Sequence, residues 1–481
     1  MRLINVRIIL KILSTILLIE SAIFILCLPV VFIYGEKTLP FLGSAGLTLI
    51  PAVLFFFLSR RCEVSKASTR DGYIAVAVSW IMLTVMGTLP YLLGGSIPSF
   101  INAFFESSSG FTTTGSSIVA DVEAMPFSIL FYRSLTHWIG GIGIIVLVII
   151  VLPSLRVTGY HLFSLESSLE EKIHPRTNAI GIRVLFIYMA LTIAEIILLS
   201  LGDMNIFDSI CHSFSTVATG CFSTRNTGIA GFSSYTQYIV MIFMFLAGTS
   251  QLVYYYMLKL NFKKVKQNDE LWFYTAVVLI AGAIATFILI ARTNKSIEES
   301  FREGFFQVIS FITCTGFSST DYLLWPVTGI ILLFILMFAG GSTGSTSGGI
   351  KMARHLIVLK NIKNVFVKLN HPKAISMIKL NGKVVPENTS ISILSFVALY
   401  LFIFLLGTLF LAADGSDMLT SASASATCLA GIGHGFGSIG PMSTFAGMPG
   451  VSKVFLSLLM IVGRLEIMTF FALFTKTFWK I

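Results

Sequence analysis

The sequence predicts an all-α polytopic membrane protein, in which two N-terminal helices precede four covalently linked helix–pore helix–helix repeats around a pseudo-fourfold pore. Three observations lead to this fold class: the apolar composition, four short amphipathic segments, and a Gly-containing motif that follows each of them. Hydrophobic residues make up 55% of the 481 residues and charged residues 12%, with a mean hydropathy of +0.87. These values exclude an ordinary soluble protein. Because the backbone in lipid must satisfy its own hydrogen bonds, the long uncharged runs indicate helices rather than a β-barrel.

Ten apolar runs are candidates for helices that cross about 30 Å of hydrocarbon. They cover residues 8–34, 41–60, 73–93, 128–152, 182–201, 235–258, 271–291, 326–358, 390–412 and 452–475. The first run lacks a signal-peptide cleavage site, so we interpret it as a spanning helix. The runs divide the chain into an N-terminal hairpin (1–70), a first pore repeat (71–180), a second (181–268), a third with an intramembrane Gly-rich loop (269–384), and a fourth (385–481).

The basic residues indicate how the chain is oriented in the membrane. The formal net charge is +10, and most of the 33 basic residues fall near the two termini or in four of the connections between spans. Examples from the four connections are Arg60, Arg156, Lys263 and Lys360. All these clusters lie on one side if the intervening runs span the membrane, which predicts cytoplasmic termini. The basicity is therefore an orientation signal, and we expect contact with membrane lipid but not with nucleic acid.

Four short segments, about 14 residues each, are too short to cross a bilayer and suggest re-entrant helices. They lie at 99–112, 205–218, 298–313 and 416–430, and each begins with residues that cap or favour a helix N-terminus. Each repeat contains two spans, so all four repeats share one orientation. An alternative reading, a secondary transporter of another small solute or cation, would be built from inverted repeats with an odd number of spans each. A receptor or scaffold of packed helices would not explain the placement of the Gly motifs.

The motifs after these segments predict a selectivity filter. Counting from Gly115 to Gly220, Gly316 and Gly433 gives intervals of 105, 96 and 117 residues, which indicates four structural repeats. Glycine permits the backbone geometry that points carbonyls at a cation, and threonine can add a hydroxyl ligand. The predicted ion-binding residues are Thr113, Thr114, Gly115, Ala218, Thr219, Gly220, Cys314, Thr315, Gly316, Gly431, Ile432 and Gly433. Small residues that only allow close helix packing are the alternative explanation.

A run of Gly, Ser and Thr interrupts the eighth span and predicts a gate. It comprises Gly340, Gly341, Ser342, Thr343, Gly344, Ser345, Thr346, Ser347, Gly348 and Gly349. Irregular backbone at membrane depth is tolerated only beside protein or water, so the loop should lie across the ion path below the filter. A nucleotide P-loop is excluded because Ile350 separates Gly349 from Lys351. A flexible bend without a gating role is the alternative.

Arg464 lies inside the final span, where a cation must face a cavity or a partner. It could form an electrostatic barrier, contact the carbonyls of the Gly-rich loop, or belong to a structural ion pair. Glu106 and Asp208 could concentrate cations at the outer mouth, or could serve only capping and packing. The six cysteines and the histidines His137, His212 and His434 show no metal-ligand spacing. No nucleophile, base and orienting acid stand together, so we expect neither an enzyme nor a bound cofactor.

The chain resembles the TrkH/KtrB superfamily of bacterial potassium transporters over nearly its whole length. The most specific parts are HWIGGIGIIVL (137–147), VATGCFSTRNTG (217–228), AGGSTGSTSGGIK (339–351) and VGRLEIMTFF (462–471). The extra N-terminal hairpin makes the TrkH branch the nearer one. Gly431, His434 and Cys221 stand where we expect other residues in that family, and AGTSQLVYYY (247–256) matches its pattern loosely.

The resemblance implies a homodimer of pores in the bacterial inner membrane, with K⁺ as the transported ion at the filter residues. It implies a gate in the Gly-rich loop with Arg464 beside it. It also implies a cytosolic TrkA-like regulatory subunit, which would carry any nucleotide. Because no motif is as long as the TVGYG sequence of a potassium channel, we expect weaker discrimination between alkali cations. The residues leave open whether movement is passive or coupled to protons or sodium.

Overall fold

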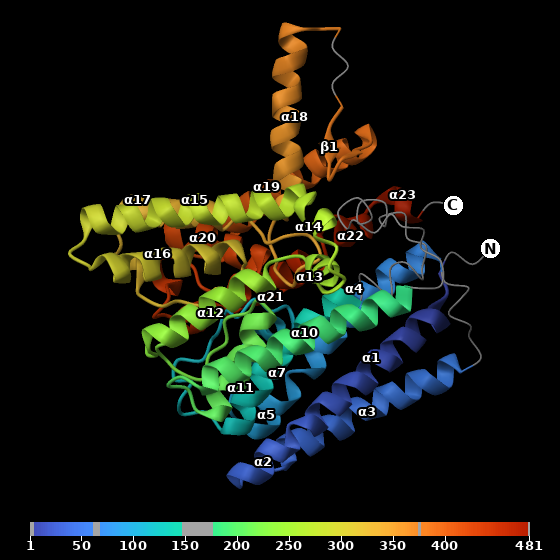
Figure 1. Cartoon of the computed structure of the whole chain (residues 1–481). Helices are drawn as coiled ribbons and strands as arrows, with labels where there is room; N and C mark the ends of the chain where they lie inside the picture. The colour runs from blue at the N-terminus through green and yellow to red at the C-terminus, as the bar shows by residue number, and fades with distance from the viewer. Residues whose placement is uncertain (1–3, 61–67, 147–176, 374–376, 480–481) are drawn as a thin grey trace.

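The computed structural model describes residues 4–60, 68–146, 177–373 and 377–479, and this part of the chain is almost entirely helical (Figure 1). Its only strands are β1 (Lys379–Leu380) and β2 (Lys383–Val384), which form a small antiparallel hairpin. Part of the predicted fourth span and the basic residues Arg61, Lys66, Arg156, Lys172 and Arg176 lie outside the described residues.

The N-terminal hairpin consists of α1 (Val6–Leu26), α2 (Leu28–Tyr34) and α3 (Leu39–Ser59). Small residues let α1 and α3 approach closely, and two serines of α1 bridge the helices. Ser14 Oγ donates to the Ala52 carbonyl at 2.7 Å, and Ser21 Oγ donates to the Ala45 carbonyl at 3.1 Å. Helix α1 also packs on α4 and α2 packs on α7, so the hairpin rests on the first repeat.

The remaining elements recur four times in the order span, short helix, loop, span. The first set is α4 (Thr69–Met86), α5 (Leu89–Gly94), α6 (Phe100–Phe111) and α7 (Phe127–Val146). The second is α10 (Thr177–Ser200), α11 (Ile206–Val217), α12 (Ser234–Ala247), α13 (Gln251–Leu258) and α14 (Phe262–Lys266). We call these sets units 1 and 2.

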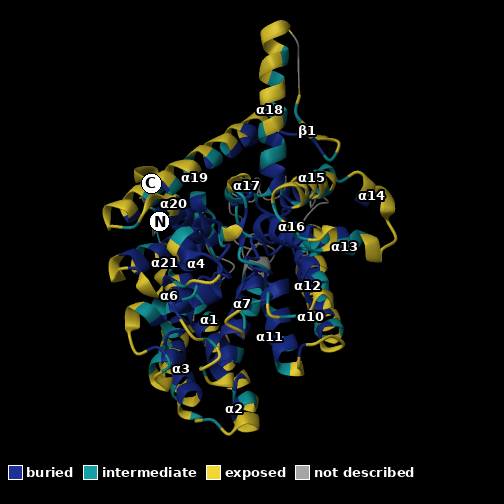
Figure 2. Ribbon diagram, turned by 90° about the vertical axis from the view of Figure 1, so that its left-hand side faces the viewer, coloured by how far each residue is buried: buried dark blue, intermediate teal, exposed yellow. Residues whose placement is uncertain are grey.

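Unit 3 contains α15 (Asp269–Arg292), α16 (Ile297–Ile312), the 3₁₀ turn η3 (Tyr322–Leu324), α17 (Val327–Leu336) and α18 (Met352–Asn370). Unit 4 contains α19 (Glu387–Ala413), α20 (Met418–Ala430), η4 (Gly437–Ile439), η5 (Phe445–Gly447), α21 (Gly450–Arg464), α22 (Ile467–Ala472) and α23 (Lys476–Trp479). Helix α18 projects from the body, and its outer turns are largely exposed (Figures 1 and 2).

The predicted spans all contain helices, but not all of them are continuous. Among the described residues, six helical stretches are long and apolar enough to cross a membrane. They are Val6–Tyr34, Leu39–Ser59, Arg70–Gly94, Gly181–Ser200, Asp269–Arg292 and Glu387–Ala413. The span predicted over 235–258 is broken, because α12 and α13 meet at a 91° bend. The span predicted over 452–475 also breaks, at Glu466, whose φ is +65°.

The four short helices α6, α11, α16 and α20 have 12, 12, 16 and 13 residues, close to the predicted segments. At 1.5 Å per residue they are shorter than the hydrocarbon thickness. Asn205, Ser296 and Asp417 cap three of them by accepting a backbone N–H, whereas Ser99 makes no such bond. At α20, hydrogen bonds from Thr420 lower the pKa of the capping Asp417 carboxyl.

The units are arranged in a ring. The second span of one unit packs on the short helix of the next: α7 on α11, α12 on α16, and α21 on α6. Between units 3 and 4 the contact is aromatic, with the Phe311 and Phe334 rings 6.0 and 6.1 Å from that of Phe436. Units 1 and 3 therefore lie opposite each other, as do units 2 and 4.

We expect Glu36→Ala to lower the free energy of unfolding by about 1–2 kcal/mol, because its carboxylate caps α7. The carboxylate accepts the backbone N–H groups of Phe127 at 2.7 Å and Ser128 at 3.1 Å. Thermal unfolding in detergent measures the change, with Lys37→Ala as the neighbouring control. Equal melting temperatures for the two variants would contradict this role for Glu36.

Candidate ion-conduction site

The chain makes the same turn as it leaves each short helix. Each unit has a residue with positive φ at this point. The residues are Thr113 (58°), Thr219 (56°), Cys314 (56°) and Gly431 (75°) in units 1 to 4. Such a conformation costs a non-glycine residue about 1–3 kcal/mol and persists only where the surroundings impose it. Its recurrence in four units shows that these segments share one backbone path.

Backbone hydrogen bonds fix which residues correspond between units. In each unit, an N–H immediately after the left-handed residue donates to a carbonyl five residues back. These bonds run from Thr114 to Ser109, Gly220 to Ser215, Thr315 to Ser310, and Ile432 to Thr427. Thr114, Gly220, Thr315 and Ile432 are therefore equivalent.

This register corrects the predicted alignment of unit 2. The triplet equivalent to Thr113–Thr114–Gly115 is Thr219–Gly220–Cys221, one residue later than the predicted Ala218–Thr219–Gly220. Ala218 instead ends helix α11 as its C-cap. The sequence comparison matched the Thr-Gly dipeptide, whereas the helix end and the left-handed turn determine the true register.

The next layer brings Gly115, Cys221, Gly316 and Gly433 together at the centre of the ring. The three glycines have φ values of 82°, 78° and 109°, which side chains disfavour. Space is equally restrictive: a Cβ on Gly316 would lie 1.6 Å from the Ile432 carbonyl oxygen. Backbone carbonyls converging in this way can replace the water around a cation.

Cys221 is the one residue in this layer that is not a glycine. A Cβ built on Gly115 or Gly433 would lie 2.2 or 2.1 Å from its Sγ, and one built on Gly316 would lie 3.3 Å from its Cβ. Cys221 thus contacts all three other units, including unit 4 on the opposite side. Its thiol donates to the Thr114 carbonyl at 3.6 Å. The sequence marked Cys221 only as a departure from the family and did not indicate this central position.

The Gly-rich loop lies directly beneath the ends of the short helices. Thr346 Oγ1 donates to the carbonyl of Val217, the last residue of α11, at 3.0 Å. A Cβ on Gly348 would lie 2.0 Å from the carbonyl oxygen of Ala430, the last residue of α20. Cys314, just after α16, donates through Sγ to the carbonyl of Ala339, the residue before the loop, at 3.7 Å, and a Cβ on Gly349 would lie 3.2 Å from that Sγ. The loop therefore contacts units 2, 3 and 4 beneath the glycine layer.

Two contacts that the sequence did not reveal hold the loop at its sides. Ser342 N–H donates to the Gly248 carbonyl at 2.8 Å, and Gly248 lies at the bend between α12 and α13. Glu270, buried at the start of α15, accepts from the N–H of Thr343 at 2.6 Å and from its hydroxyl at 3.0 Å. In the sequence, the signal that could have identified Glu270 was its position as an acidic residue next to an apolar run.

Arg464 connects the loop to unit 1. The buried guanidinium donates to the Thr346 carbonyl at 2.9 Å and to the Gly140 carbonyl of α7 at 3.0 Å. This is the carbonyl contact considered from the sequence. Arg354, near the start of α18, pairs instead with Glu466 at 2.6 Å. All four units thus converge on the loop and its arginine.

The acidic residues considered for the outer mouth are both buried and paired. Glu106 forms an ion pair with Arg133 at 2.8 Å, and Asp208 forms one with Arg225 at 2.9 Å while accepting the Thr224 hydroxyl at 2.6 Å. The structure therefore favours packing over a free cation-attracting role. Among the described residues, no group of three or more His, Cys, Asp or Glu could hold a metal ion.

Comparisons with known proteins agree with this architecture. The TrkH family, described as "Cation transport protein", matches residues 46–480. The Trk system potassium uptake protein TrkH of Salmonella typhimurium is 34% identical over 427 residues, covering 87% of this chain and 88% of that protein. The Trk system potassium uptake protein TrkG of Escherichia coli K12 is 34% identical over 418 residues, covering 86% of each.

A solved structure shares the fold over the whole chain. The crystal structure of the potassium transporter TrkH from Vibrio parahaemolyticus superposes with a TM-score of 0.90 at 30% identity, covering 99% of this chain and 100% of that one. These relatives are transport proteins rather than enzymes. The chain belongs to the TrkH family of cation transport proteins.

Proposed function

We propose that this protein mediates potassium uptake across the bacterial inner membrane, with Thr113–Gly115, Thr219–Cys221, Cys314–Gly316 and Gly431–Gly433 as its selectivity filter. The observation that carries the proposal is the convergence of four left-handed turns on one layer of three glycines and Cys221. The C-terminal ends of four helices add partial negative charge beside that layer, which favours a cation. The printed names of the relatives support potassium as the cation.

The Gly-rich loop is the proposed gate, with Arg464 holding it closed. K⁺ that has left the filter would meet residues 340–349 before it reached the cytoplasm. The contacts of Thr346 with Val217 and Arg464 support this role, because they fasten the loop under the filter. An inverted-repeat transporter fits less well, since its short helices would approach the centre from opposite sides, whereas one loop lies beneath the ends of α11 and α20.

The assembly and its regulation are proposals as well. We infer a homodimer with cytoplasmic termini and a TrkA-like cytosolic subunit that carries the regulatory nucleotide, while this chain binds no cofactor of its own. The basic residues of the projecting helix α18, including Lys360, Lys363 and Lys368, support a docking surface for that subunit.

Purified protein in liposomes should take up rubidium, and potassium should compete more strongly than sodium. In Gly316→Ser the new Cβ would meet the Ile432 carbonyl, so we expect uptake to be lost or the potassium preference to fall about tenfold, equivalent to about 1.4 kcal/mol. Gly46→Ser is the control, because nothing lies within 4 Å of a Cβ there. A Gly316→Ser variant with wild-type selectivity would refute the filter assignment.

Loosening the loop should raise uptake in the absence of any partner. Thr346→Val removes one hydrogen bond worth about 1 kcal/mol, which shifts the closed–open equilibrium about fivefold. Arg464→Gln should have a larger effect because Arg464 contacts both the loop and α7. Thr408→Val, which loses only a bond to Phe404 within α19, is the matched control. Equal rubidium uptake by wild type and both loop variants would exclude the gate.

Cys221→Gly should conduct several-fold faster than wild type, because the thiol occupies the centre of the glycine layer. External Ag⁺, which binds thiolates, should block the wild type but spare Cys221→Gly. Cys27→Ser, at a buried site in the N-terminal hairpin, should remain sensitive. Block of Cys221→Gly at the same Ag⁺ concentration would place the reactive thiol elsewhere.

A further inference from the structure

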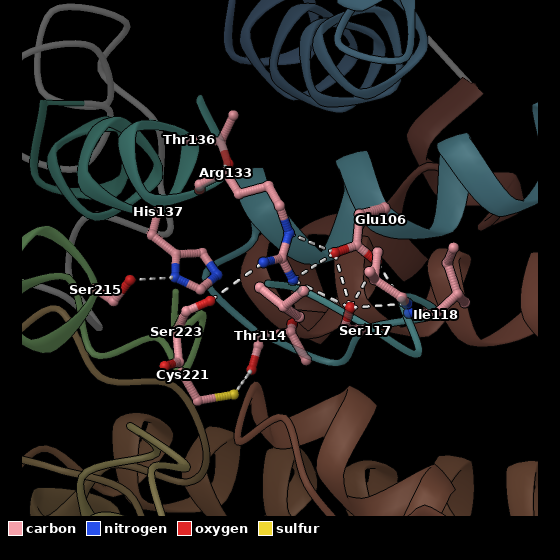
Figure 3. A network of polar contacts seen from close by, with 12 residues as sticks. Glu106, Thr114, Ser117, Ile118, Arg133, Thr136, His137, Ser215, Cys221 and Ser223 are labelled. Atoms are coloured by element: carbon pink, nitrogen blue, oxygen red, sulfur yellow. Dashed lines mark hydrogen bonds and ion pairs between the residues drawn. The ribbon is translucent and has the colours of Figure 1, made fainter. Parts of the chain in front are cut away.

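We propose that Glu106 and Arg133 are positioning residues that fix the spacing between the filter segments of units 1 and 2 and thereby help to set cation selectivity. The inference rests on the proposed filter function. Both side chains are buried, with exposed fractions of 0% and 2%, and they lie behind the filter rather than in it (Figure 3).

Glu106 holds the chain that leaves the first filter segment. From helix α6 its carboxylate accepts the Ser117 hydroxyl at 2.9 Å and the Ile118 N–H at 3.0 Å. These residues directly follow Gly115 and Ser116. The position of the carboxylate therefore determines where the first filter segment ends.

Arg133 connects that carboxylate to the second filter segment. Its Nε donates to Glu106 at 2.9 Å, and Nη1 donates to the Ser223 carbonyl of unit 2 at 3.4 Å. The guanidinium Cζ also lies 4.0 Å from the centre of the Phe222 ring, and the His137 ring stacks on Phe222 at 4.1 Å. Phe222 directly follows Cys221, so α7 of unit 1 fixes the backbone of unit 2 next to the glycine layer.

Equivalent carbonyls in other units also accept a hydrogen bond from the preceding unit. Four residues after the left-handed turn stand Ser117, Ser223, Ser318 and Gly435. Ser117 accepts from Phe445 N–H of unit 4 at 2.8 Å, Ser223 accepts from Arg133, and Gly435 accepts from the Tyr322 hydroxyl of unit 3 at 2.8 Å. These bonds join unit 4 to unit 1, unit 1 to unit 2, and unit 3 to unit 4, and Arg133 supplies the one charged donor among the three.

The charge matters because a buried ion pair is seldom needed for stability alone. Apolar residues of similar volume often stabilise a protein as well as a buried pair does, whereas a pair in good geometry fixes relative positions. The planar guanidinium can contact the carboxylate, the carbonyl and the ring at once, which an ammonium group cannot do. The spacing between two filter segments is the property that this geometry controls.

The test compares rubidium uptake competed by potassium or sodium in liposomes containing wild type, Arg133→Lys, and the double variant Glu106→Gln/Arg133→Gln. Lysine keeps a positive charge beside Glu106, so that variant should fold, but it lacks the planar set of N–H donors of the guanidinium. The double variant leaves no unpaired charge. We expect both to lose potassium preference about five- to tenfold, while their melting temperatures in detergent stay near that of wild type.

Arg302→Gln is the matched control. Arg302 also connects two units, because it pairs with Glu298 of α16 at 2.9 Å and donates to Gln237 of α12. It lies near the N-terminal end of its short helix, away from the filter, and its variant should keep wild-type selectivity.

The outcomes separate this inference from the proposed function. Wild-type protein that shows neither rubidium uptake nor thermal stabilisation by potassium refutes the function. Wild-type protein that transports selectively, with Arg133→Lys and the double variant equally selective, refutes the positioning role. A fall in melting temperature without a change in selectivity also refutes it, because Arg133 would then be purely structural.

Discussion

The structure depends on one constraint: four short helices end in the buried centre of the protein, where their last carbonyls are shielded from solvent and need partners. Backbone polar groups at this depth must find partners in protein, in a cavity or on an ion. The Gly-rich loop supplies part of the answer, since the Thr346 hydroxyl bonds Val217 and the loop backbone passes close to Ala430. The left-handed turns supply another part, because their N–H groups bond helix-end carbonyls such as those of Ser109 and Ser310. The Phe111 carbonyl, at the end of α6, lies against α7, where a Cβ on Gly140 would be 2.0 Å from its oxygen. The turns of the proposed filter and the loop of the proposed gate therefore have a shared origin, because both supply partners to the ends of the same short helices.

That shared origin couples the two parts mechanically. The loop lies against the ends of α11 and α20 and beside Cys314, so it cannot move without changing the partners of those helix ends. Arg464 extends the coupling to α7 through Gly140. The same helix carries Arg133 and His137, which contact Phe222 beside the glycine layer. Helix α7 thus links the proposed gate, through Arg464, to the proposed filter, and a shift of this helix would change contacts at both.

The sequence allowed much of the fold to be predicted, because helix length and apolar periodicity are local properties. The short helices, the Gly-rich loop and the buried Arg464 follow from such patterns. The register of unit 2 did not, since the Thr-Gly dipeptide there is displaced by one residue and only the left-handed turn at Thr219 reveals it. The bend at Gly248 and the Arg133–Glu106 pair depend on residues that meet only in the folded ring. Pattern alone carries no information about such contacts.

The four units surround one axis but are not equivalent, and this limits how the proposed filter could select ions. Unit 2 places a thiol where the others have glycine, and unit 4 has Ile432 where units 1 and 3 have threonine. The hydroxyls of Thr114 and Thr315 each pair with a threonine two residues back, at 2.9 and 2.8 Å, and hydroxyls at this level occur in only two of the four units. Backbone carbonyls remain the uniform ligands around the ring. In the proposed filter, selectivity would then depend on how the carbonyls are spaced, and this spacing is the property proposed for the residues behind it.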